Sequence, residues 1–280
     1  MRNRFSLGWV VVSYFLICGG LTAAGAAYAL AAIEDPRAGH AAFFVGAAIG
    51  GFLAGRASPH RSYLEPALAA SLVVVSIIAF VHATPMGKYG IALAKSAADV
   101  SVWKHAAIAG GLGFAGGFLG ALVGEAMQPR RPGALGLRWL LLGVFISAGA
   151  LFVGSTAAAI ILVNEAAEKA LGQMMTGGLD PSRPLLSEDR ITVAAAATAA
   201  SASILGGLVT QLGAPVRALL PSAGGAFLVL GGAVLGVAAL VGRAPELVGP
   251  AIVVATTAGV LALVGALVSY LVGRASGRLS

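Results

Sequence analysis

Eight long apolar runs constrain the fold of this chain more than any other feature. Each is close to the 20 or so residues that an α-helix needs to cross the hydrocarbon core of a bilayer. Of the 280 residues, 58% are hydrophobic and 10% are charged, whereas a soluble domain carries about 25% charged residues. The sequence therefore predicts an all-α, polytopic integral membrane helix bundle with spans at 8–33, 40–57, 65–83, 105–126, 138–163, 191–212, 223–242 and 248–272.

The second span, in the hairpin from Phe43 to Pro66, is short and rich in glycine. Its glycines are spaced four apart, which places each pair on one helix face and lets a neighbouring backbone approach closely. If this span were re-entrant, the count would fall to seven and the C-terminus would change sides. The glycines predicted to mediate helix packing here and in other spans are Gly46, Gly50, Gly51, Gly55, Gly116, Gly120, Gly124, Gly206, Gly207, Gly232 and Gly236.

Two sets of matching residues predict an internal duplication. At an offset of 130 positions, Trp9 matches Trp139, Phe15 matches Phe145, and Gly19 matches Gly149. At an offset of 156, Gly50 matches Gly206, Gly51 matches Gly207, Pro59 matches Pro215, and Arg61 matches Arg217. An insertion of 26 residues, at 165–190, accounts for the change of offset. The prediction is a parallel four-plus-four repeat with halves at 1–133 and 134–280, although coincidental alignment of glycine-rich spans is the competing interpretation.

The basic residues predict the orientation in the membrane. With the N-terminus inside, the short inside connections and the termini hold ten of the 18 Lys and Arg residues, as the positive-inside bias favours. We therefore expect a multi-pass protein of the inner (cytoplasmic) membrane with both termini cytoplasmic. We expect the first span to be retained rather than cleaved as a signal peptide, because its apolar run is long and has a later counterpart. The basic residues form no face with interleaved aromatic residues, so no nucleic-acid partner is expected.

Two segments predicted to lie outside are longer than turns. Residues 86–104 mix basic and apolar residues and are typical of a helix lying in the membrane interface. Residues 165–190 begin as a polar continuation of the fifth helix and break at Gly177 and Pro181. An ordinary solvated loop is the alternative for both segments.

Ionisable residues within lipid are costly, so each one is a functional candidate. Three ionisable residues near the ends of spans and two polar amides give five substrate or pathway candidates: Glu65, His82, Glu125, Asn164 and Gln211. The simpler interpretation is that the two acids are charges at helix ends and that the amides bond neighbouring helices. His82 and His105 are placed to meet at the outer surface, but two histidines lack the further ligands of a metal site. The single cysteine, Cys18, lies within a span and forms no disulfide framework.

No catalytic motif, cofactor motif or metal motif is present, so we predict no catalytic residue, no cofactor and no metal. The first functional hypothesis is a permease or channel for a small neutral or weakly charged solute, which the duplication favours. The alternative is a non-catalytic structural or assembly subunit of a larger membrane complex. A third is an intramembrane enzyme built from Glu65, His82, His105 and Glu125, which would have to meet at one centre. The expected partners are the lipid bilayer and either further copies of the chain or other membrane subunits.

Overall fold

The computed structural model describes residues 5–31, 36–58, 63–84, 87–88, 92, 101–128, 137–176, 185–213, 219–240 and 244–275. In these ranges the long elements are all helices, and eight of them are long and apolar enough to cross a membrane. They are α1 (Leu7–Leu30), α2 (Pro36–Ala57), α3 (Leu64–Ala83), α5 (Val102–Ala126), α6 (Leu137–Thr176), α7 (Glu188–Gly213), α8 (Leu219–Leu240) and α9 (Ala244–Ala275). The prediction of a helical bundle with eight apolar helices is confirmed.

The second span is a complete helix of 22 residues, so the count of apolar helices is eight and not seven. Its C-terminus is capped by another helix end: the Gln128 side-chain amide donates to the carbonyl oxygens of Gly55, at 2.6 Å, and Ser58, at 3.0 Å. Carbonyls in the last turn of a helix have no partner within the helix, so these bonds satisfy groups that would otherwise be unpaired. The predicted interfacial helix at 86–104 falls mostly outside the described residues, and its last three residues belong to α5.

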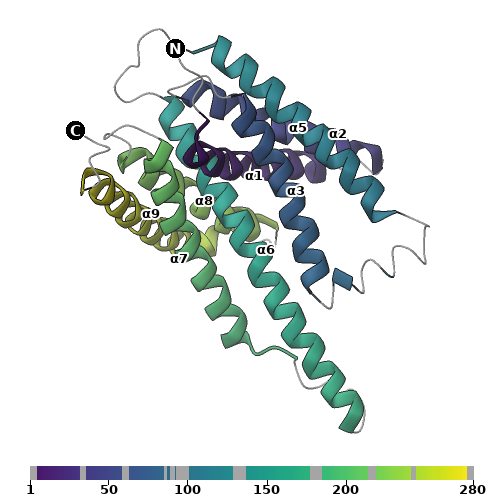
Figure 1. The fold of residues 1–280 in the computed structure, drawn as a ribbon. Coiled ribbons are helices and arrows are strands. Elements are labelled where there is room, and N and C mark those ends of the chain that lie inside the picture. The colour runs from purple at the N-terminus through teal and green to yellow at the C-terminus, as the bar shows by residue number, and fades with distance from the viewer. Residues whose placement is uncertain are drawn as a thin grey trace.

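The helices form two groups of four, with α1, α2, α3 and α5 in one and α6, α7, α8 and α9 in the other (Figure 1). In the first group, α1 packs on α2 and α3, and α5 packs on α2 and α3. In the second, α6 packs on α7 and α8, and α9 packs on α7 and α8. The two groups are joined mainly by the contact of α1 with α6.

One hydrophobic core lies at the junction of the groups, and one lies in each group. The junction core contains Trp9 and Leu16 of α1, Ala54 of α2, Ile146 of α6 and Val209 of α7. Outside these cores, large apolar side chains cover the surface; Val253 of α9, for example, is 66% exposed. An apolar exterior over eight helices of this length belongs in lipid, so the protein is a multi-pass membrane protein in contact with a bilayer.

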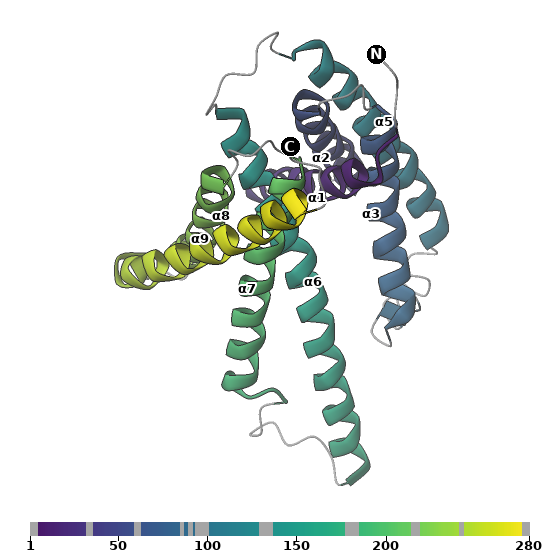
Figure 2. The same ribbon diagram turned by 60° about the vertical axis from the view of Figure 1, so that its left-hand side comes forward.

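Helix α6 is much longer than a membrane span. Its 40 residues extend about 60 Å, about twice the thickness of a hydrocarbon core. Figure 2 shows the C-terminal part of α6 and the N-terminal part of α7 projecting side by side away from the other helices. The predicted polar continuation of the fifth helix is therefore observed as far as Thr176, and the predicted break at 177–181 lies outside the described residues.

Candidate functional site

The contact between α1 and α6 is made by two glycines in a reciprocal arrangement. A Cβ atom on Gly19 of α1 would collide with the carbonyl oxygen of Phe145 on α6. A Cβ atom on Gly149 of α6 would collide with the carbonyl oxygen of Phe15 on α1, and would lie 3.0 Å from the backbone nitrogen of Gly19. Only glycine permits this approach of the two backbones. A contact in which each partner presents the same group to the other is the geometry of a two-fold axis.

The paired glycines of α2 serve two different neighbours. A Cβ atom on Gly46 would lie 2.8 Å from the Leu21 Cα atom, and one on Gly50 would lie 2.5 Å from the Ile17 Cα atom, so this face of α2 meets α1. On the other face, a Cβ atom on Gly51 or Gly55 would collide with a carbonyl oxygen of α5. Each pair spaced four apart thus lies against one helix, which explains how α2 can be covered on both sides by backbone.

A glycine that meets a backbone carbonyl oxygen also occurs between α5 and α2 in the first group and between α9 and α7 in the second. A Cβ atom on Gly120 of α5 would collide with the Ala48 carbonyl oxygen of α2, and one on Gly265 of α9 would collide with the Ile204 carbonyl oxygen of α7. Gly265 lies 145 positions after Gly120, and Ile204 lies 156 positions after Ala48. The offset of 156 is the one that relates the glycines of α2 to those of α7.

The remaining predicted packing glycines fall into two classes. Four of them lie against a neighbouring helix. Gly116 and Gly124 of α5 meet carbonyl oxygens of α2. Gly206 of α7 meets Ser147 of α6, and Gly207 meets the Ala262 carbonyl oxygen of α9. Gly232 and Gly236 of α8 face open space, with nothing within 4 Å of a built Cβ atom. No neighbouring helix of the described structure therefore explains these two glycines.

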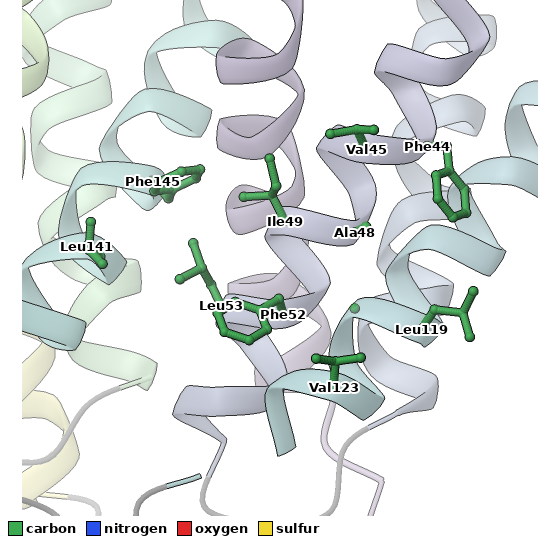
Figure 3. A pocket seen from close by; sticks show the side chains of 11 residues that line it. Phe44, Val45, Ala48, Ile49, Phe52, Leu53, Leu119, Val123, Leu141 and Phe145 are labelled. Carbon is green, nitrogen blue, oxygen red and sulfur yellow. The ribbon is translucent and has the colours of Figure 1, made fainter. Parts of the chain in front are cut away.

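An apolar groove lies where the two groups meet (Figure 3). It has a volume of about 570 Å³ and is lined by α2, α5 and α6, with Phe44 and Phe52 on one side and Leu141 and Phe145 on the other. All of its lining residues are apolar or glycine. A surface of this kind suits a lipid chain and offers no polar group to a hydrophilic solute.

The two predicted acidic candidates lie at one end of the first group. Glu65 is in the first turn of α3 and is only 3% exposed; its carboxylate accepts a hydrogen bond from the Ser6 backbone N–H at 3.2 Å. Glu125 is in the last turn of α5 and is half-buried.

The two predicted amides lie in the second group. Gln211, near the end of α7, is 5% exposed, and neither atom of its amide has a hydrogen-bond partner among the described residues. Asn164 is half-buried on α6, and its Oδ1 atom is likewise buried without a described partner. The structure therefore does not gather the five candidates into one site, because Glu65 and His82 lie at opposite ends of α3 and the two amides lie in the second group.

Histidines gather at the opposite end of the first group. His40 of α2, His82 of α3 and His105 of α5 line the rim of one pocket, which we call the histidine pocket. The rings of His40 and His105 stack with their centroids 5.6 Å apart, and His82 stacks on Trp103 at 5.3 Å. His82 and His105, which we predicted to meet at the outer surface, thus line the same pocket. His40 was not singled out from the sequence, because nothing local shows that α2 begins beside the end of α3.

The four side chains required by the enzyme hypothesis do not share a centre. Glu65 and His82 are in the first and last turns of α3, and 17 residues of helix separate them by about 25 Å. Glu125 and His105 are likewise at opposite ends of α5. Within the described part of the chain, no group of three or more His, Cys, Asp or Glu side chains is placed to hold a metal ion.

An ion pair links α6 to α7 where the two helices project. Glu165 of α6 accepts from Lys169 one turn later, at 3.0 Å, and from Arg190 of α7, at 3.1 Å. Beyond this ion-pair network, Leu171, Met174 and Met175 are 61%, 59% and 83% exposed. We call the part of α6 from residue 164 to 176, with residues 188–190 of α7, the arm.

Comparisons with known proteins return no match: no protein-family model, no curated protein and no solved structure is significantly similar to this chain.

Proposed function

We propose that this protein is a non-catalytic structural or assembly subunit of a larger membrane complex, located in the inner membrane with both termini in the cytoplasm. The observation that carries this proposal is the arm. Spanning the bilayer takes about 20 of the 40 residues of α6, so the arm extends into water. There it exposes a row of large apolar side chains, which a solvated helix end does not require.

The arm has the properties of a docking surface for another protein. Met174 and Met175 lie three and four positions after Leu171, so each neighbours Leu171 on the helix surface. Methionine is flexible and polarizable, and it is common on surfaces that bind partner proteins. The network at Glu165 ties α6 to α7 at the base of the arm, and these side chains lie on α6 beyond that junction. An apolar row beyond this junction favours binding of a protein partner outside the membrane.

Polar substitution of the arm is expected to remove the partner. In the variant Leu171→Ser, Met174→Gln, Met175→Gln, the apolar contact area is lost while the membrane part is unchanged. Truncation of central interface side chains costs about 2 kcal/mol or more each, enough to abolish stable binding. Native mass spectrometry of the chain, purified gently from its own membrane, would compare the stoichiometry of co-recovered proteins for the two forms.

The matched control keeps the arm apolar with Leu171→Met, Met174→Leu and Met175→Leu, and it should recover the same partners as the wild type. Recovery of the wild-type chain alone, or of the same partners in the same ratio with the polar arm, would contradict the proposal. Circular dichroism of both variants should show unchanged helix content, which separates loss of a partner from loss of the fold.

A permease or channel is the second candidate, and the reciprocal contact of α1 with α6 favours it. Two sets of similar contacts support a duplication with halves at 1–133 and 134–280: the α1 and α6 contact relates residues 130 positions apart, and the Gly120 and Gly265 contacts relate residues 145 and 156 positions apart. An even number of spans in each half gives parallel repeats related by an axis along the membrane normal, as in one class of transporters. Glycine packing at a single crossing would then allow the halves to rock. The apolar groove at the junction argues against a pathway for polar solutes there.

Proteoliposomes test the second candidate directly. If the protein is a permease for small neutral solutes, vesicles containing it should re-swell faster than empty vesicles after an osmotic shock with glycerol or urea. The expected result for the assembly subunit is the rate of empty vesicles. Re-swelling that is accelerated by the wild type, and equally by the polar arm variant, would favour transport and remove the arm from the mechanism.

A further inference from the structure

We propose that the histidine pocket binds an anionic phospholipid, with one acyl chain in the pocket and the phosphate group at the histidine rim. This inference is independent of the proposed function. The pocket has a volume of about 380 Å³ and lies between α2, α3 and α5. Below the rim it is lined by apolar side chains, including Phe43, Val74 and Ile78. Such a cavity suits a hydrocarbon chain and no polar molecule.

The rim lies at the depth of lipid headgroups. His82 is in the last turn of α3, and His105 is in the first turn of α5, so the pocket opens where these spans end. Trp103 is stacked on His82 and is 62% exposed, and tryptophan is enriched at the interface between membrane and water. A lipid whose chain occupied the pocket would therefore carry its phosphate to the level of the histidines.

The charge at this end of the helices favours an anion. Lys104, beside His105, and Lys88, beyond the end of α3, are both exposed. Among the described residues of α2, α3 and α5, the acidic side chains are Glu65 and Glu125, and both lie at the other end. Basic groups near the membrane surface attract anionic lipid headgroups.

The histidines can donate hydrogen bonds to a phosphate. The Nδ1 atom of His105 lies 3.1 Å from the Ser101 carbonyl oxygen, which can only accept, so Nδ1 carries a proton. Protonation of Nε2 would then give His105 a second donor and a positive charge. His40 stacks on the same ring, and two stacked imidazolium rings repel each other unless an anion lies beside them. A phosphate beside the rings would offset this repulsion.

Lipid retention in native mass spectrometry tests this inference. The whole chain is released from micelles that contain equal amounts of phosphatidylglycerol and phosphatidylcholine with the same acyl chains. At pH 6 the wild type should retain phosphatidylglycerol preferentially. Each of the substitutions His40→Gln, His82→Gln and His105→Gln should lower this preference about fivefold, the effect of removing one cation close to an anionic headgroup. Lys169→Gln removes a cation from the arm and should leave the preference unchanged.

The wild type supplies a second measurement, which does not depend on the folding of any variant. Histidine is the side chain whose charge ordinarily changes between pH 5 and 8, whereas a phosphate diester stays ionised there, so raising the pH from 6 to 8 should lower the preference for phosphatidylglycerol. Equal retention of the two lipids by the wild type at pH 6 would overturn the inference. So would a preference that persists unchanged at pH 8, or in a folded variant with all three histidines replaced, because the histidines would then not hold the phosphate.

Discussion

Replacing Gly19 or Gly149 with alanine is expected to destabilise the protein by about 3 kcal/mol, the upper end of the cost of overpacking. Each new Cβ atom would meet a backbone carbonyl oxygen, of Phe145 or of Phe15, which cannot turn aside as a side chain can. The two helices would have to separate, so Leu16 of α1 and Ile146 of α6 would pack less closely in the junction core. Reversible unfolding in mixed micelles, followed by circular dichroism, measures the change in free energy.

The double variant Gly19→Ala, Gly149→Ala distinguishes a shared contact from two separate ones. The two glycines face each other, so either substitution alone already forces the helices apart. The double variant should therefore cost clearly less than the sum of the single variants, because contacting residues are not additive. The matched controls are Gly25→Ala on α1 and Gly172→Ala on α6, where nothing lies within 4 Å of the new atom. Additive costs, or equal costs for the controls, would mean that α1 and α6 do not cross at these glycines.

The second large effect is expected at Gly120 and Gly265, each of which faces a carbonyl oxygen of a neighbouring helix. Alanine at either position should cost about 2 kcal/mol, because α5 would be pushed from α2, or α9 from α7. The two contacts share no partner and belong to different groups of helices, so the double variant should cost the sum of the two. Thermal unfolding in detergent, with Gly110→Ala and Gly232→Ala as controls at open positions, measures the effects.

The costs of alanine at Gly120 and at Gly265 also test the proposed duplication. If the halves are repeats of one four-helix unit, equivalent substitutions should have similar costs, since each removes the same kind of contact. A large cost at Gly120 with none at Gly265 would show that α9 does not approach α7 as α5 approaches α2. The equivalence of the two groups would then rest on the α1 and α6 crossing alone.

Much of the local fold could be predicted from the sequence. Eight apolar runs in a chain with few charges leave helices as the available structure in lipid, where backbone groups must be satisfied within the segment. The predicted span at 40–57 lies within the helix Pro36–Ala57, and that at 65–83 matches Leu64–Ala83. The observed helix boundaries differ most from the predicted span at α6, because hydropathy marks where a span leaves the lipid and not where its helix ends. The polar residues from Glu165 onward are good helix formers in water, so the helix continues.

The candidate sites were less predictable, because each depends on which helix ends lie together. The sequence indicated His82 and His105 but not His40, and nothing in it showed that the Ser6 backbone lies beside Glu65. The spacing of glycines showed that certain helix faces could approach a backbone. The same spacing occurs at Gly232, but Gly232 faces open space. A spacing of four defines a face of a helix but carries no information on what covers that face.

The sequence by itself determined that this is a helical, multi-pass membrane protein, because the energetic cost of unsatisfied backbone in lipid depends only on local composition and length. Only the tertiary structure decided that α1 and α6 cross at reciprocal glycines, that three histidines share a pocket rim, and that α6 and α7 project as an arm. These features are contacts between residues far apart in the chain. Close packing of backbones and side chains selects one set of such contacts from the many that the same apolar faces would allow.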